Sequence, residues 1–369
     1  MKAKRFNKIL TTTLLISILG FSTFMTTLPV EAQMPLPSGV PRGDVLVIRE
    51  MSAPFPDPYQ FNNKVPGRSV TSATIALSIY AYLWIANGTN GELIPWLAEG
   101  VAYSENFTTC RIYTRKGAYW NDGVPFTADD VVFTIQTALN TTEWSTNGYA
   151  VTWVESVTAE NATTVLIKLK ASNPRFHYPL AAIMVSTDWF IVPKHIWEGQ
   201  DPVAFKFNPP LSIGPYNFKA VDTGGMWTLW EREENWWAYK LWGLKPSPEY
   251  VLSISYGPEE KNALSMARHE LDTGMLTTSE VAQIAFTGGA PYIIGFRDTP
   301  PYAWPYSYCS KSLTFNLLRY PYNITVVREA LTFACNMSNL VQGFAGYDGS
   351  VPLTSPIPVI RTDAAQELY

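Results

Sequence analysis

The side chains best suited to chemistry in this chain of 369 residues are its three histidines, His177, His195 and His269. None has a cysteine or carboxylate at the spacing of a metal site, so we predict no metal. The sequence also contains no G-x-S-x-G, no phosphate-binding P-loop and no G-x-G-x-x-G. We therefore expect packing or surface roles for the histidines, and neither catalytic residues nor a cofactor.

Neighbouring carboxylates are the next candidates for general acid–base catalysis. They occur as the adjacent pairs Asp129-Asp130, Glu233-Glu234 and Glu259-Glu260. Adjacent side chains diverge on a helix or a strand, whereas a catalytic pair must converge on one bond. We interpret these pairs as solvated helix caps, and the sequence favours a protein that is not an enzyme.

The cysteines, Cys110, Cys309 and Cys335, are odd in number and show no metal-binding spacing. In an exported chain Cys309 and Cys335 could form a disulfide, and a set of unpaired buried thiols is equally compatible with the sequence.

The composition is that of a globular protein, with 47% hydrophobic and 16% charged residues. A net charge of −4, with no basic run after residue 8, gives no indication of nucleic-acid binding. The chain has 13 Trp, 20 Tyr and 18 Phe, of which we expect most in the core and a minority lining a recess.

Residues 1–32 have the pattern of a signal peptide: four basic residues, an apolar stretch from Ile9 to Met25, and a Val30-Glu31-Ala32 cleavage site. A retained membrane anchor is the alternative. No cysteine lies near the cleavage point for lipid attachment, and no later apolar run is long enough to span a membrane. We expect export to the cell surface or periplasmic space, with anchoring through a missing C-terminal segment left open.

The most informative elements lie between Gly91 and Leu139. Alternating residues from Thr108 to Arg115 predict a half-buried strand with Cys110, Ile112 and Thr114 on one face. Asn121-Asp122-Gly123 predicts a turn. Thr127 and Asp130 then form the pattern of a capping box at the start of an amphipathic helix.

Elsewhere the sequence has a mixed order of helices and strands. We predict strands at 44–50, 151–157, 163–169 and 227–231, and helices at 72–84 and 326–342.

Three blocks of residues together resemble one family. The first is RKGAYWNDGVPFTADDVVFTI, the second combines the Val192-Pro193-Lys194-His195 segment with the Gly214-Pro215-Tyr216 turn, and the third runs from Glu260 to the helix that starts at Val326. In order and spacing they resemble the peptide- and nickel-binding solute-binding proteins (extracellular solute-binding protein family 5) of ABC importers. Where the family has a Gly-Glu-Ile-Asp turn at the end of a helix, this chain has Arg268-His269-Glu270-Leu271-Asp272 in its place.

The resemblance implies an α/β fold of the periplasmic-binding-protein type (type II, two lobes with an extra domain). We expect it to be incomplete, since the C-terminal part of the family's fold is missing. The implied division is a signal peptide (1–32), a first segment of lobe I (33–70), extra domain II (71–169), a second segment of lobe I (170–255), and the N-terminal part of lobe II (256–369).

The function that the resemblance implies is reversible capture of a short peptide between two lobes, followed by delivery to the permease subunits of an ABC importer in the membrane. An oligosaccharide is the alternative ligand. A secreted enzyme that degrades peptides or glycans and a structural surface protein are further alternatives.

Candidate ligand contacts are aromatic and amide side chains in loops, namely Phe61, Asn62, Tyr302, Trp304 and Tyr306, although packing in loops and core is as compatible with each. The candidate hinge is Tyr256-Gly257. Six N-x-S/T sequons are candidate glycosylation sites, at Asn87, Asn106, Asn140, Asn161, Asn323 and Asn336.

Overall fold

The computed structural model describes residues 36–49, 54–67, 73–87, 91–182, 189–255, 257–274, 279–289, 292–295, 314–336 and 339. The chain divides into two compact units, residues 1–42 and 43–369. In the described part of the first unit, the N–H of Val40 donates to the carbonyl of Pro37 at 3.1 Å and closes a turn. A single 3₁₀ turn, η1 (Arg42–Asp44), leads into the first strand.

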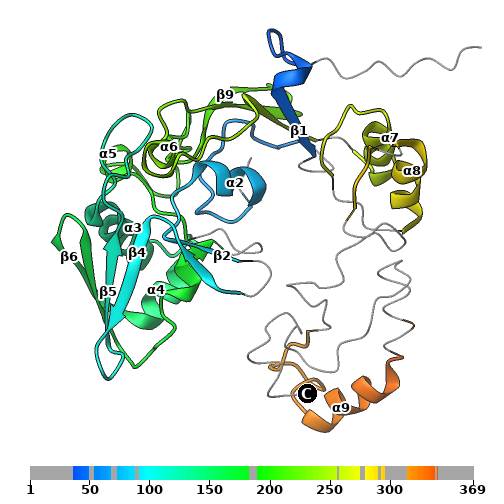
Figure 1. Ribbon diagram of the computed structural model, residues 1–369. Coiled ribbons are helices and arrows are strands. Elements are labelled where there is room, and N and C mark those ends of the chain that lie inside the picture. Colours follow the sequence, from blue (N-terminus) through cyan, green and yellow to red (C-terminus); the bar gives the residue numbers. More distant parts are fainter. Residues whose placement is uncertain are drawn as a thin grey trace, which may run out of the picture. The chain divides into compact units, whose positions relative to one another are not determined.

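A mixed four-stranded sheet has the strand order β1-β11-β10-β9 (Figure 1). Its strands are β1 (Val45–Arg49), β11 (Tyr250–Ile254), β10 (Trp227–Arg232) and β9 (Tyr216–Val221). β1 and β11 are parallel, and β10 is antiparallel to both of its neighbours. All five residues of β11 are buried, as expected for an inner strand.

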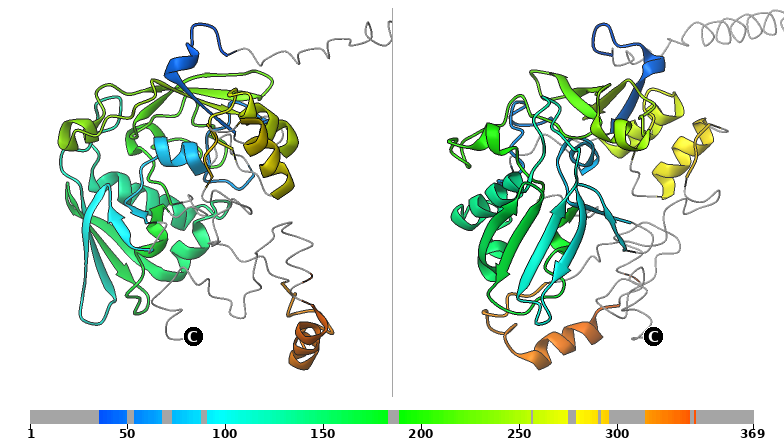
Figure 2. Two further views of the ribbon diagram at one scale, coloured as in Figure 1. Left: turned by 45° about the vertical axis from the view of Figure 1, so that its right-hand side comes forward. Right: turned by 60° about the vertical axis from the view of Figure 1, so that its left-hand side comes forward.

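An antiparallel four-stranded sheet has the order β4-β5-β7-β6. It consists of β4 (Ala98–Tyr103), β5 (Thr109–Thr114), β7 (Thr164–Leu169) and β6 (Val154–Asn161). In β5 the residues Cys110, Ile112 and Thr114 are buried while Arg111 and Tyr113 are exposed, which confirms the predicted alternation. Helix α3 (Ala128–Asn140) lies against β6 and β7 and buries Val131 and Ile135 (Figure 2).

A small three-stranded sheet connects distant parts of the chain. Its order is β3-β2-β8, from strands β3 (Leu93–Pro95), β2 (Trp84–Ala86) and β8 (Ala181–Ala182). One hydrophobic core runs from Ile48 of β1 through this small sheet to Ile167 of β7. The 71–169 segment therefore shares its core with residues on both sides of it, and its boundaries as an extra domain remain a prediction.

The remaining helices are α2 (Ala73–Ile79), α4 (Asn147–Trp153), η2 (Tyr178–Leu180), α5 (Lys194–Trp197), α6 (Trp237–Trp242), α7 (Glu259–Ala267), α8 (Ser279–Gly289) and α9 (Thr325–Ala334). α7 and α8 pack together through Ala263, Val281 and Ala285. The described side chains of α9 are all at least partly exposed. Among the described residues no helix is both long and apolar enough to cross a membrane.

Three sequence-based predictions of elements need correction. The predicted helix at 326–342 ends earlier, since α9 stops at Ala334 and the backbone of Cys335 is extended. The predicted strand at 151–157 begins only at Val154, because Asn147–Trp153 is helix α4. The predicted helix at 72–84 is shorter, since α2 ends at Ile79 and Trp84 already opens β2.

Candidate functional site

The most distinctive stretch of the sequence forms a junction between two helix starts. The Asp130 carboxylate accepts the backbone N–H of Thr127 at 2.9 Å, which completes the predicted capping box of α3. Its other oxygen accepts the backbone N–H of Lys194, at the start of α5, also at 2.9 Å. Burial of Asp130 raises the pKa of its carboxyl, and these two hydrogen bonds act in the opposite direction. The motif residues therefore have a scaffolding role.

A shallow recess of about 340 Å³ lies beside this junction. It is lined by Val124, Pro125, Thr127, Asp129, Asp130, Lys194, His195 and Glu198. At its edge His195 Nε2 lies 2.8 Å from Asp122 Oδ2. The His195 ring also packs edge-on against Trp120, at 6.4 Å between ring centroids, which is a packing role of the kind expected for this histidine.

A second location is favoured by topology. In open α/β sheets, ligands bind outside the carboxyl ends of parallel strands. Here the parallel strands β1 and β11 end side by side at Arg49 and Ile254. On the free side of β1 the chain returns after α7, and Thr273 forms a parallel bridge with Ile48. Three parallel segments therefore end at one edge of the sheet. We call this the carboxyl edge and define it by the residues at the three ends, namely Arg49, Ser255, Thr273 and Gly274.

Asp272 holds the returning segment against β1. Its Oδ2 accepts the backbone N–H of Val47 at 2.7 Å, and its own N–H donates to the Val47 carbonyl at 2.9 Å. One step further, the Arg49 N–H donates to the Thr273 carbonyl at 3.1 Å. The backbone of the carboxyl edge is thus fixed by hydrogen bonds between residues far apart in sequence.

The loop between β9 and β10 closes one side of this edge. The Phe55 N–H donates to the Gly225 carbonyl at 3.0 Å, and the Ser255 N–H donates to the Met226 carbonyl at 2.8 Å. Gly225 has φ +74°, and a Cβ built there would lie 2.4 Å from the Phe55 carbonyl oxygen. Only glycine meets both conditions.

The carboxyl edge carries one cationic side chain among these residues, the half-buried Arg49. A guanidinium is planar and always charged, and it suits bidentate binding of a carboxylate. The edge therefore combines fixed backbone groups with one cationic side chain.

Comparison with known proteins identifies the family. Residues 92–367 match the model of the bacterial extracellular solute-binding proteins, family 5 (middle region). The chain belongs to this family.

Relatives of this family 5 protein bind several classes of ligand. The present chain is 26% identical over 310 residues to the glutathione-binding protein GsiB of Pectobacterium atrosepticum, a match that covers 82% of this chain and 53% of that protein. It is 32% identical over 139 residues to the oligopeptide-binding protein AppA of Bacillus subtilis, covering 36% of this chain and 23% of that one. The chain thus spans about half or less of these relatives.

The solved structures show the same fold. The oligopeptide-binding protein of Thermotoga maritima, solved with bound mannohexaose, is 25% identical with a TM-score of 0.65, covering 82% of this chain and 53% of that one. The fold is that of the periplasmic oligopeptide-binding proteins, which are binding proteins and not enzymes.

Two of the predicted ligand contacts in the described chain are buried. Phe61 and Asn62 are 0% exposed. The Phe61 ring packs edge-on against Phe218, and the Asn62 amide donates to the carbonyls of Pro202 and Phe205 at 3.0 and 2.9 Å. These contacts hold the loop in the core and weigh against direct contact with a ligand.

The other predicted contacts, Tyr302, Trp304 and Tyr306, lie outside the described residues, as does Tyr256 of the predicted hinge. Gly257 is described and has φ +86°. The return of Asp272 and Thr273 to β1 ties the residues after Gly257 back to the same sheet. A hinge at this point remains a prediction, and these contacts weigh against it.

Sequence reasoning missed Arg49 and Asp272. Arg49 is the last residue of a predicted strand, so its position could have been noted from the expected carboxyl edge. Asp272 occupies the aspartate position of the family's turn, but its acceptor role toward Val47 needs the fold.

Proposed function

We propose that this solute-binding protein is the extracytoplasmic component of an ABC importer, that it reversibly binds short peptides, and that it delivers them to a membrane permease. Membership of family 5 carries the proposal. The oligopeptide- and glutathione-binding relatives support a peptide ligand. No chemical step is needed, because an imported ligand must be released intact.

We further propose that Arg49 binds a carboxylate of the peptide. Arg49 ends β1 at the carboxyl edge, where the backbone is fixed by Thr273. A hydrogen bond to a charged group contributes about 1.5–3 kcal/mol, so Arg49→Ala should weaken binding about 10- to 100-fold. Arg111→Ala is the matched control, because Arg111 lies on β5 and pairs with Glu160 at 2.9 Å. It should leave the affinity unchanged.

Ligand binding can be tested by thermal unfolding of the full chain with peptide mixtures and with oligosaccharides. A ligand at 100 times its Kd stabilises the folded state by about 2.7 kcal/mol. Stabilisation by peptides, with the peptides recovered intact, supports the proposal. Hydrolysis of the peptide would instead identify an enzyme.

An oligosaccharide is the second candidate ligand. The observation that favours it is the mannohexaose bound to the similar Thermotoga maritima protein. Stabilisation by oligosaccharides alone, unaffected by Arg49→Ala, would select this alternative. Native mass spectrometry of the protein purified from its host would then identify the bound sugar.

Export follows from the same proposal. The leader-like residues 1–32 would direct the chain across the membrane to the periplasmic space or cell surface. Edman or mass-spectrometric sequencing of the mature N-terminus should find it at Gln33.

A further inference from the structure

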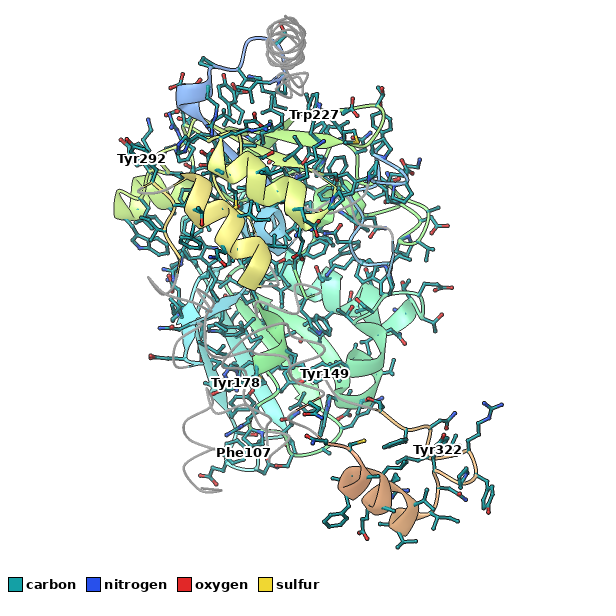
Figure 3. All side chains as sticks on the ribbon, turned by 90° about the vertical axis from the view of Figure 1, so that its right-hand side faces the viewer. Phe107, Tyr149, Tyr178, Trp227, Tyr292 and Tyr322 are labelled. Carbon is teal, nitrogen blue, oxygen red and sulfur yellow. The ribbon has the colours of Figure 1, made fainter. Side chains whose placement is uncertain are left out.

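Two of the six sequons lie in tight turns at strand ends. Asn106 is in the turn between β4 and β5, and Asn161 ends β6 just before β7. Both asparagines are exposed. Phe107, the middle residue of the first sequon, is labelled in Figure 3; it is 40% exposed and has φ +54°.

In the first turn the amide oxygen of Asn106 is held by its own sequon. Asn106 Oδ1 accepts the Thr108 hydroxyl at 2.9 Å and the Thr108 N–H at 3.3 Å. It also accepts the Ser104 hydroxyl at 2.7 Å. Because the oxygen is anchored, Nδ2 is the atom of this amide that remains for solvent, and it makes no hydrogen bond within the described residues.

The second turn repeats this arrangement. Asn161 Oδ1 accepts the Thr163 N–H at 2.9 Å and the Thr163 hydroxyl at 3.2 Å. Both turns thus place the sequon hydroxyl on the amide oxygen, as in an Asx turn extended by a Thr side chain.

The described contacts of three further sequons are different. Asn140 is the last residue of α3, and its Nδ2 donates to the Gln136 carbonyl at 2.8 Å, so the nitrogen is engaged. In the sequon of Asn323, the hydroxyl oxygen of Thr325 accepts Arg328 Nη2 at 3.1 Å. Asn336 Oδ1 accepts the N–H of Asn339.

We propose that Asn106 and Asn161 are N-glycosylation sites in the folded protein and that Asn140 is not. The donor is a lipid-linked oligosaccharide and the catalyst an oligosaccharyltransferase. The Asn Nδ2 forms a bond to C1 of the first sugar and loses one proton, while the bond from C1 to the lipid phosphate oxygen breaks and the lipid phosphate leaves. The reaction requires an exposed acceptor amide and is independent of the ligand that the protein binds.

The test uses the purified, folded full chain with membranes that contain an oligosaccharyltransferase and its lipid-linked donor. Glycopeptide mass spectrometry should find one glycan on Asn106 and one on Asn161, and none on Asn140. Asn106→Gln and Asn161→Gln should each remove one glycan mass. Thr108→Val and Thr163→Val should do the same, whereas Thr108→Ser should retain it. An unchanged thermal midpoint will show that each variant is folded.

Each asparagine is tested independently, on the glycopeptide that contains it. Asn106 or Asn161 without glycan, in membranes that modify a control sequon peptide, overturns the proposal for that residue. A glycan on Asn140 overturns the argument that an engaged amide nitrogen prevents transfer.

Discussion

The Asp130 carboxylate and the backbone N–H of Lys194 join two helix starts through a 2.9 Å hydrogen bond. The same carboxylate caps its own helix at Thr127. Asp130 is only 4% exposed, so its loss would leave two backbone N–H groups without their acceptor. Asp130, which belongs to the segment that carries the family resemblance, therefore holds two parts of the scaffold together.

Asp130→Ala should destabilise the protein by about 2–4 kcal/mol, since each unsatisfied buried donor costs about 1–3 kcal/mol. Asp130→Asn keeps one acceptor oxygen and should therefore lose less stability than Asp130→Ala. Asp129→Ala, an exposed change in the same helical turn, should lose under about 1 kcal/mol. Urea unfolding of the three variants measures these differences, and equal losses for Asp129 and Asp130 would contradict the junction's role.

The effect of Asp130 should also depend on pH. Burial raises the pKa of its carboxyl above the ordinary value, so the folded state binds this proton more tightly than the unfolded chain does. The resulting stabilisation is present below the ordinary Asp pKa and is lost as pH rises through the raised one. The stability difference between the native protein and Asp130→Asn should therefore narrow with rising pH in that interval. A difference that widens would show that the hydrogen bonds dominate the pKa.

The capping box was predictable because its partners, Thr127 and Asp130, are three residues apart. The bond from Lys194 to Asp130 spans 64 residues, and no local pattern specifies it. Asn62 illustrates the same limit: its loop position suggested a pocket, yet its amide bonds to carbonyls about 140 residues away and is buried.

Tertiary contacts also override local preference at α4. Val151, Thr152 and Trp153 favour a strand by residue type, but they lie in a helix. In this helix the Tyr149 hydroxyl donates to the Phe176 carbonyl at 2.9 Å and the two rings stack at 5.6 Å. The sequence carries no sign of this partner, because Phe176 belongs to a segment beyond the next two strands.

Gly214 is required for close packing. The sequence marked Gly214 only as part of a Gly-Pro-Tyr turn, whereas in the fold a Cβ at Gly214 would lie 1.9 Å from the carbonyl oxygen of Ser78 in α2. Gly214→Ala should therefore destabilise by about 3 kcal/mol or more, because backbone must move. Gly148→Ala is the control: it lies in α4 with open space around it and should be neutral or up to about 1 kcal/mol stabilising. Thermal unfolding separates the two, and similar effects would refute the packing argument.

His269 occupies a backbone conformation that favours glycine. It has φ +60° after α7, where the Glu270 N–H donates to the Ser265 carbonyl and the His269 N–H to that of Met266, a Schellman arrangement. His269→Gly should stabilise by about 0.5–1 kcal/mol. The glycine variant also loses the contact between the rings of His269 and Tyr292, whose centroids lie 5.3 Å apart. Tyr292 is labelled in Figure 3. His269→Val should destabilise, because a β-branched residue tolerates this φ poorly. If glycine also destabilises, the Tyr292 contact outweighs the backbone strain.

Asp272 should control the mobility of the carboxyl edge. Its Oδ2 accepts the Val47 N–H at 2.7 Å, a side-chain contact within the pairing of β1 with residues 272–273. Asp272→Ala removes that acceptor at a partly exposed site and should destabilise by about 1 kcal/mol. The local effect should be larger than the global one, so hydrogen exchange at the Val47 and Arg49 amides should accelerate about tenfold while β10 amides stay unchanged. Asp222→Ala is the matched control, since the Asp222 carboxylate accepts only within its own turn, from the Met226 N–H at 3.0 Å. Uniform acceleration across the sheet would mean that Asp272 supports the whole fold, and no acceleration at Val47 would mean that the backbone bonds alone hold the returning segment.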